Sequence, residues 1–256
     1  MSAADKAEAI RNRKGGTPIS SLTAYDYPTA RLLDEAGIDL LLVGDSLGMV
    51  VLGFPDTTHV TLDDMIHHTA AVARAKPNAL VVADLPIGTY PDSSTALINA
   101  RHLVDAGAEA VKLEGGVRQA HKVRTIVADG IPVLGHLGML PQRVLEEGGY
   151  RKKGRTEEET AHLHQGATAL VEAGVFAIVL ESVLEPVARE ITAAIPVPTI
   201  GIGCGTNSCD GEIAVVTDVI GSYPWFVPPF ATTLADTATI IRDAARQWAA
   251  RLHQSQ

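Results

Sequence analysis

The sequence predicts a (β/α)₈ barrel, and three observations support this fold class. Eight short apolar runs recur along the 256 residues. Stretches with the apolar spacing of helices separate many of them. Near-continuous apolar strands that alternate with helices are typical of a parallel sheet buried on both faces. Eight such units in about 250 residues match a closed barrel, and a doubly wound open sheet is the alternative architecture.

The apolar runs are the expected strands. In chain order they cover residues 19–24, 39–44, 79–83, 110–114, 131–136, 176–181, 198–203 and 212–217. Between them, segments such as 27–37 and 157–174 have apolar residues three and four positions apart and end in Gly, as helices do. The interval from Gly203 to Val216 is short for a full helix. No linker breaks the pattern, so we expect a single barrel domain over residues 1–256.

The composition narrows the function classes. A formal charge of −9 argues against a nucleic-acid surface, which needs clustered Lys and Arg. The N-terminus has no apolar signal-peptide core, and no run of about 20 apolar residues predicts a membrane span. Cys204 and Cys209 do not form a disulfide framework by number or spacing, so a reduced, cytoplasmic setting is expected. The polar segment 146–159 is either a solvated loop above the fifth strand or a lid over the active site.

Polar, mostly ionisable side chains lie where the predicted strands end. They are Tyr25 and Asp26, Asp45 and Ser46, Asp84, Lys112 and Glu114, His136, Glu181, and Asp218. In a barrel the carboxyl ends of the strands share one face, and active sites form there. One charge at a strand end is ordinarily a helix cap or a solvated turn. Several like charges together repel each other unless a cation or substrate separates them.

Asp45, Asp84 and Glu114 are hard oxygen ligands without an accompanying Cys/His set, which argues against zinc. Mg²⁺ commonly takes one or two carboxylates and completes its shell with water and substrate. The sequence therefore predicts a magnesium site. The alternative is that Asp45 caps the following turn and Asp84 caps the next helix.

Three further strand-end residues have candidate roles. Lys112 and Glu114 alternate with Val111 and Leu113 and so face the barrel interior. Either they form a structural ion pair there, or Lys112 holds an anionic substrate. Glu181 follows a wholly apolar run, so its pKa should be raised toward that of a general base, unless an Arg pairs with it. His136 is either a site residue or a satisfied core histidine. "GIGCG" (201–205) lacks the context of a dinucleotide site, and nothing around Cys204 indicates a nucleophile.

At these residues the sequence resembles the ketopantoate hydroxymethyltransferase family. The matching stretches are "LLVGDSLGMVVLG", "TLDDMIHHTAAV", "VVADLPIGTY", "VKLEGG", "IPVLGHLGMLPQ", "FAIVLE" and "PTIGIGCG", and together they cover most of the chain. The resemblance implies a (β/α)₈ barrel and hydroxymethyl transfer from 5,10-methylenetetrahydrofolate to 3-methyl-2-oxobutanoate. The product would be 2-dehydropantoate (ketopantoate), in pantothenate and coenzyme A synthesis.

The resemblance also implies roles for single residues. Asp45, Asp84 and Glu114 match the Mg²⁺ site, with one ion per subunit. Ser46 and Lys112 match groups that bind the substrate, as do Asp45 and Asp84 through the metal, and His136 matches a motif position beside them. Glu181 matches the proton acceptor. Family members are cytoplasmic homo-oligomers, often decamers, whose partners are a 2-oxo acid and a reduced folate.

Some loops depart from the family pattern. They are "GFPDTTHVT" (53–61), "GCGTNSCDGEI" (203–213), Thr217–Asp218 and "PWFVPPF" (224–230). A diverged paralogue for another 2-oxo acid therefore stays open, as does a phosphoenolpyruvate mutase/isocitrate lyase-type lyase, although the Cys-containing loop typical of those lyases is absent. A binding protein that has lost its chemistry would not need Glu181. A nicotinamide oxidoreductase would need a clearer Gly-rich fingerprint.

Overall fold

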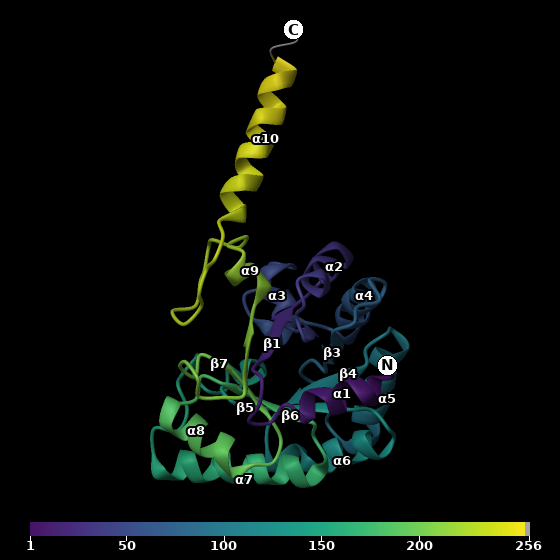
Figure 1. Cartoon of the computed structure of the whole chain (residues 1–256), viewed down its shortest axis with the longest axis vertical. Helices are drawn as coiled ribbons and strands as arrows, with labels where there is room; N and C mark the ends of the chain where they lie inside the picture. The colour runs from purple at the N-terminus through teal and green to yellow at the C-terminus, as the bar shows by residue number, and fades with distance from the viewer. Residues whose placement is uncertain (254–256) are drawn as a thin grey trace. The chain divides into compact units, whose positions relative to one another are not determined.

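The computed structural model describes residues 1–253, and its centre is a closed barrel of parallel strands in sequence order (Figure 1). The strands are β1 (Ile19–Thr23), β2 (Leu40–Val43), β3 (Leu80–Asp84), β4 (Ala110–Glu114), β5 (Val133–Gly138), β6 (Ala177–Glu181), β7 (Thr199–Ile202) and β8 (Gly211–Ala214). The barrel prediction is confirmed, and the open-sheet alternative is wrong.

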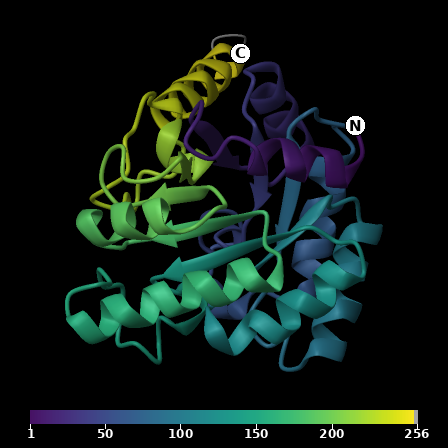
Figure 2. The ribbon, with the colours of Figure 1, turned by 60° about the horizontal axis from the view of Figure 1, so that its bottom comes forward.

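Helices follow most of the strands and cover the outside of the barrel. The longer ones are α1 (Ala3–Arg11), α2 (Tyr27–Glu35), α4 (Leu62–Ala73), α5 (Ser93–Asp105), α6 (Ala120–Ala128), α7 (Glu157–Ala173), α8 (Glu185–Ala194) and α10 (Thr237–His253). Single turns form α3 (Leu47–Val50), α9 (Val216–Val219), η1 (Thr57–His59), η2 (Val117–Gln119) and η3 (Pro141–Arg143). Figure 2 shows the teal and green helices running along the outside of the strands.

The eighth strand differs from its prediction. It occupies Gly211–Ala214 rather than 212–217, because its ladder with β7 ends after Gly201↔Glu212 and the backbone then turns. The N–H of Asp218 donates to the carbonyl of Val215, which starts α9. Between Ile202 and Gly211 the chain forms turns and no helix, as the short interval in the sequence predicted.

Alternation along the strands places the polar residues inside the barrel. A single buried cluster contains Leu80 and Val82 of β3, Ala110 of β4, Leu134 of β5, and Ala177 and Val179 of β6. Successive side chains of a strand point to opposite faces. The next residues in the same register are Asp84, Lys112 and Glu114, His136, and Glu181. The lower part of the barrel is therefore apolar, and its carboxyl end is charged.

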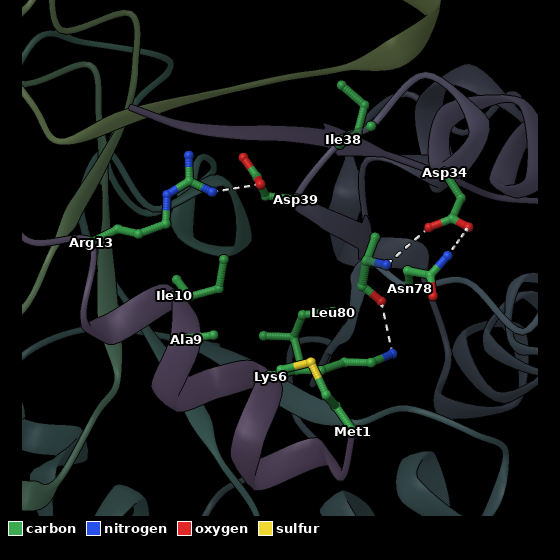
Figure 3. A pocket seen from close by; sticks show the side chains of 12 residues that line it. Met1, Lys6, Ala9, Ile10, Arg13, Asp34, Ile38, Asp39, Asn78 and Leu80 are labelled. Carbon is green, nitrogen blue, oxygen red and sulfur yellow. Dashed lines mark hydrogen bonds and ion pairs between the residues drawn. The ribbon is translucent and has the colours of Figure 1, made fainter. Parts of the chain in front are cut away.

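Helix α1 covers the amino-terminal end of the strands, because Ala7 and Ile10 belong to the same buried cluster. A cavity of about 300 Å³ lies beside it at the start of β2 and β3 (Figure 3). Several of its polar side chains pair with one another. Arg13 Nη1 lies 2.5 Å from Asp39 Oδ1, and the Asn78 amide donates to Asp34 (3.2 Å). Since barrel active sites form at the other end, these pairs are structural.

By its internal contacts the chain divides into two compact units, Met1–Ile213 and a second that begins at Ala214. The first holds strands β1–β7 and helices α1–α8, and the second holds α9 and α10. The single domain over residues 1–256 stays a prediction. Within residues 1–253, no helix combines the length and apolar composition needed to cross a bilayer.

Candidate active site

The carboxyl ends of five neighbouring strands, β2 to β6, bring the predicted site residues together. Asp45 and Ser46 follow β2, Asp84 ends β3, Lys112 and Glu114 lie at the end of β4, His136 lies in β5, and Glu181 ends β6. Asp45, Asp84, Lys112, Glu114 and His136 are each at most 4% exposed. We call this group the mouth cluster. Two other strand-end residues are not in this group. Asp26 caps α2 by accepting from the Thr29 N–H (2.8 Å), and Asp218 belongs to the second compact unit of the chain.

Lys112 links two strands of the mouth cluster. Its Nζ lies 2.8 Å from Asp84 Oδ1 and 3.2 Å from His136 Nδ1. His136 Nε2 lies 2.9 Å from the carbonyl oxygen of Met139, to which it donates. The ring is therefore the Nε2–H tautomer, and Nδ1 accepts from Lys112. Among the ion pairs of residues 1–253, Lys112 pairs with Asp84 and not with Glu114, the partner in the predicted structural alternative.

Neither aspartate acts as the cap that was the alternative to a metal ligand. The N-cap of α5 is Asp92, and the residue at the start of α3 is Ser46, which makes no side-chain capping bond. Asp84 Oδ2 instead accepts from the backbone N–H of Asp45 (3.0 Å). Asp45 Oδ2 accepts from the side-chain amide of Gln142 (2.8 Å). Both carboxylates are thus held by groups of the mouth itself.

Ser46 has a partner that the sequence did not reveal. Its Oγ lies 2.9 Å from the hydroxyl of Tyr25, the residue two positions after β1. Tyr25 is only 4% exposed, so its ring is a fixed support. The pair places a hydroxyl beside Asp45, where it can donate to an anionic ligand.

Burial and mutual repulsion control the charges of the mouth cluster. Burial first, and then the charge of Asp84, raise the pKa of Asp45 to about 7. Burial raises the pKa of Asp84, and it raises that of Glu114 well above its ordinary value. Burial alone would lower the pKa of Lys112, but the surrounding carboxylates outweigh it and raise that pKa. Burial and the Lys112 charge lower the pKa of His136 well below 6.5, so the imidazole is neutral.

Glu181 stands slightly apart from the other carboxylates. Its side chain is 15% exposed, and Oε2 lies 3.6 Å from His136 Nε2. Burial raises its pKa to about 8, assisted by the charges of Asp45 and Asp84 and opposed by Lys112. No Arg pairs with Glu181 among the ion pairs of residues 1–253, so the structural alternative predicted for it finds no support. A carboxylate that has a raised pKa and is partly exposed can accept a proton near neutral pH.

Glycine at position 138 fits β5 against β6 beside this carboxylate. Gly138 has φ +99°, and a Cβ there would lie 2.1 Å from the carbonyl oxygen of Glu181. That carbonyl accepts from the N–H of Met139 (2.8 Å). The backbone of Glu181 is therefore fixed by a contact that only glycine allows.

The donor set fits a divalent cation bound by an open site. Three buried carboxylates face one ammonium group, so the mouth cluster is negative when all are ionised. Among the described residues, Glu114 Oε1 is buried and has no hydrogen-bond partner. No group of three or more His, Cys, Asp or Glu side chains in residues 1–253 forms a ready-made metal cluster. The carboxylate oxygens and the unpartnered Glu114 Oε1 are ligands suited to an ion such as Mg²⁺, which keeps water and substrate among its ligands.

The polar segment 146–159 borders the same mouth. Its last residues, 157–159, start α7. Lys153 forms an isolated bridge with Val183, two residues after Glu181, and the Lys153 N–H donates to the carbonyl of Ser182 (2.8 Å). Burial and the charges of Glu181 and Asp45 raise the pKa of Tyr150 to about 12. The segment is anchored beside Glu181, although a lid that moves stays a prediction.

Cys204 is unsuited to act as a nucleophile. It is buried, and its Sγ donates to the carbonyl oxygen of Leu180 (3.0 Å). A hydrogen bond with Cys209, and then burial, raise the pKa of Cys204, so it stays a thiol.

Sequence reasoning missed Gln142 and Tyr90 as parts of the site, and it placed Tyr25 at a strand end without giving it a role. Gln142 lies within the quoted stretch "IPVLGHLGMLPQ", and it is only 3% exposed. Tyr90 donates a short hydrogen bond to the Gln142 side chain. A polar residue soon after a strand end was the available signal for Gln142, but its contact with Asp45 depends on the path of the loop.

The sequence of the chain is similar to that of proteins of one enzyme family. A sequence profile described as ketopantoate hydroxymethyltransferase matches residues 5–256. Proteins named 3-methyl-2-oxobutanoate hydroxymethyltransferase are similar over most of their length. The one from Aeropyrum pernix is 54% identical, covering 95% of this chain and 88% of that protein. The one from Pyrobaculum arsenaticum is 56% identical, covering 92% and 89%.

Solved structures that resemble this chain share its fold at low sequence identity. A putative phosphonomutase from Burkholderia cenocepacia has a TM-score of 0.67 at 17% identity, covering 99% of this chain and 100% of its own. A 2,3-dimethylmalate lyase, described as a phosphoenolpyruvate mutase/isocitrate lyase superfamily member, has a TM-score of 0.65 at 20% identity, covering 96% and 87%. These likenesses concern the barrel alone. The high sequence identity is instead to the proteins named 3-methyl-2-oxobutanoate hydroxymethyltransferase, and it extends over almost the whole chain. The chain therefore belongs to the ketopantoate hydroxymethyltransferase family.

Proposed function

We propose that the chain transfers a hydroxymethyl group from 5,10-methylenetetrahydrofolate to 3-methyl-2-oxobutanoate and produces 2-dehydropantoate for pantothenate and coenzyme A synthesis. With water as the third reactant, the reaction also releases tetrahydrofolate. Family membership supports this activity. The structural observation that carries it is the Glu181 carboxylate, which has a raised pKa and lies 3.6 Å from His136 beside the buried acids and Lys112.

The substrate carboxylate would bind to Lys112 and Ser46. An ammonium group has three N–H donors. Lys112 Nζ hydrogen-bonds His136 and forms an ion pair with Asp84 at 2.8 Å, and it keeps donor capacity for a ligand. The Ser46 hydroxyl, held by Tyr25, is the second donor. Neutral His136 fixes the direction of Lys112 without adding a positive charge.

Asp45 and Asp84 would hold one Mg²⁺ per subunit, with Glu114 as the third acidic group near it. When bound, such an ion supplies Lewis-acid stabilisation of the negative charge that develops on the keto oxygen. The structural basis is the open, negative donor set and the unpartnered Glu114 Oε1.

Glu181 would remove the proton from C3 of the oxo acid. Water would release the one-carbon unit from the folate as formaldehyde, and the two broken C–N bonds become N–H bonds of tetrahydrofolate. The electron pair of the C3–H bond then forms the new C–C bond to formaldehyde, whose C=O π pair moves to oxygen. That oxygen takes the proton from Glu181 and becomes the product hydroxyl. Glu181 and the bound oxo acid would be held side by side at the mouth, so the proton transfer becomes effectively unimolecular. The Gly138 contact keeps the Glu181 backbone in place during this step.

A turnover assay with two oxo acids tests the proposal. The protein, Mg²⁺ and 5,10-methylenetetrahydrofolate are incubated with 3-methyl-2-oxobutanoate, and the product hydroxymethyl group is followed by NMR. The control acid, 3,3-dimethyl-2-oxobutanoate, has no proton at C3 and should give no product. Turnover of another 2-oxo acid but not of 3-methyl-2-oxobutanoate would instead support the diverged paralogue, and C–C cleavage would support the lyase.

We also propose that the chain works as a cytoplasmic homo-oligomer, a decamer by family resemblance. Helix α10 carries large apolar residues at helical spacing on one side, Ile241, Trp248 and Leu252, and each is 48–61% exposed. An uncovered apolar helix face of this kind is typical of an interface. The support is the pattern of α10 and the family resemblance.

A further inference from the structure

Gln142 is a buried glutamine that connects several loops of the mouth. It lies in η3, shortly after β5, and is 3% exposed. A buried side-chain amide needs partners for both N–H groups and for its oxygen. Its contacts therefore describe how the loops are held together.

Each polar group of Gln142 has a partner from a different part of the mouth. Nε2 donates to Asp45 Oδ2 (2.8 Å) and to the carbonyl of Leu85 (3.0 Å). Oε1 accepts from the hydroxyl of Tyr90. The backbone N–H donates to Glu114 Oε2 (3.2 Å). One residue thus touches two of the three acids of the proposed metal site.

The orientation of the amide is set by these partners. If the amide were rotated by half a turn, Oε1 would face the Asp45 carboxylate and the Leu85 carbonyl, which are both acceptors. Tyr90 reinforces the observed orientation because its phenolic O–H needs an acceptor, and Oε1 supplies it. Tyr90 itself is braced by the ammonium of Lys122, 5.5 Å from its ring centre.

We propose that Gln142 is a positioning residue that holds the Asp45 carboxylate ready for a divalent cation, and that Tyr90 acts through it. This inference rests on the proposed function, since it presumes that Asp45 is a ligand. By binding Oδ2, Gln142 fixes the rotation of the carboxylate. Removing a partner of this kind typically lowers metal affinity by about 10–100-fold.

The test measures Mn²⁺ affinity of the full chain by electron paramagnetic resonance, without substrates, since Mn²⁺ accepts the same oxygen ligands as Mg²⁺. We expect Gln142→Leu to weaken Mn²⁺ binding by about 10–100-fold. Tyr90→Phe should weaken it less. The double variant should bind no more weakly than Gln142→Leu alone, because the hydrogen bond by which Tyr90 orients the amide is already absent in Gln142→Leu. In turnover, raising Mg²⁺ should restore the rate of Gln142→Leu.

Thr199→Val is the control. Thr199 is also a buried polar residue, but it lies at the start of β7, where its hydroxyl bonds that of Thr192 (2.6 Å), and it has no bond to the acids of the mouth cluster. The Mn²⁺ affinity of this variant should equal that of the wild type. An equal loss of affinity in Thr199→Val and Gln142→Leu would show that any buried polar change weakens binding, and it would overturn the proposal.

Three other results would decide against the inference. Unchanged affinity in folded Gln142→Leu, checked by circular dichroism, overturns the positioning role. If that variant does not fold, unchanged affinity in Tyr90→Phe overturns it. A wild-type chain that binds no Mn²⁺ overturns the metal site and this role with it, so the two failures are distinguishable.

Discussion

Burial of Lys112 among carboxylates makes it the residue on which the mouth cluster most depends. Its Nζ lies 2.8 Å from Asp84 Oδ1 with both side chains almost fully buried. Removing one member of a buried pair costs about 3 kcal/mol, because the remaining charge is left uncompensated. The cluster should therefore be stable only while this ammonium, or a bound cation, is present.

Lys112→Met should unfold at lower urea concentration than the wild type and should raise the KM for the oxo acid. The acids have raised folded-state pKa values, so they contribute stability when protonated at low pH and lose it as pH rises through those values. The deficit should thus be larger at about pH 8 than at about pH 5.5. Urea midpoints at both pH values check this. Lys6→Met, whose ion pair with Glu109 lies at the other end of the barrel, is the control. An equal deficit in both variants would contradict the account.

The ionisation of Glu181 should determine how activity depends on pH. A base works only when deprotonated, so kcat/KM should fall as pH falls through the pKa of Glu181. That pKa is raised to about 8 by burial and then by the charges of Asp45 and Asp84, opposed by Lys112, and a bound cation would offset the two aspartate charges. The profile should therefore show one ionisation between 4.5 and about 8. A rate that rises toward low pH would exclude Glu181 as the base.

Residues that extend a strand were predictable, whereas residues placed by loops were not. Asp84, Lys112, His136 and Glu181 continue the inward alternation of apolar strands, so the barrel fold alone brings them together. Gln142, by contrast, is a neutral residue whose contact with Asp45 arises from the turn through Met139 and Pro141. The spacing of apolar residues in the sequence does not predict the course of this turn.

At the scale of elements, most strands form close to where the apolar runs predict them. The eighth is the exception, because Val215 and Val216 continue its apolar run but belong to the turn into α9. The apolar residues of a strand do not show where hydrogen bonding to the neighbouring strand ends. The β5–β6 pair is the element most directly tied to the site, since Gly138 lies opposite Glu181 in its register.

Gly138→Ala should destabilise the protein by about 3 kcal/mol and lower kcat. The cost combines a left-handed backbone with a Cβ that would lie 2.1 Å from the Glu181 carbonyl oxygen. Gly130→Ala is the matched control, because Gly130 has φ +87° with nothing within 4 Å of its Cβ position. It should cost about 1 kcal/mol and leave kcat unchanged. Urea unfolding and steady-state kinetics measure both, and equal effects would refute the contact argument.

At the scale of the whole molecule, the chain carries its candidate site in the unit Met1–Ile213. The second unit was not predicted, because the sequence between β8 and α10 contains no composition shift that resembles a linker. Its composition is nevertheless informative. Trp225, Phe226 and Leu234 are 54–79% exposed, in addition to the apolar side of α10.

We expect this apolar surface to be covered by other copies of the chain. Light scattering coupled to gel filtration should give a mass that is a multiple of the 27.0 kDa chain. Trp248→Glu should reduce that mass, because a charge at an apolar interface is costly to bury. Glu190→Gln on α8, where the glutamate is 62% exposed, should not change it. A monomeric wild-type chain would contradict the homo-oligomer proposal.

The most direct measurement of the central claim is hydrogen exchange at C3 of 3-methyl-2-oxobutanoate in D₂O with Mg²⁺ and no folate, followed by NMR. The account predicts that the wild-type chain removes the C3 proton signal and that Glu181→Gln leaves it at the rate of buffer alone, while the surface variant Glu190→Gln behaves as the wild type. Binding of the oxo acid without exchange, or exchange that persists in Glu181→Gln, would contradict it.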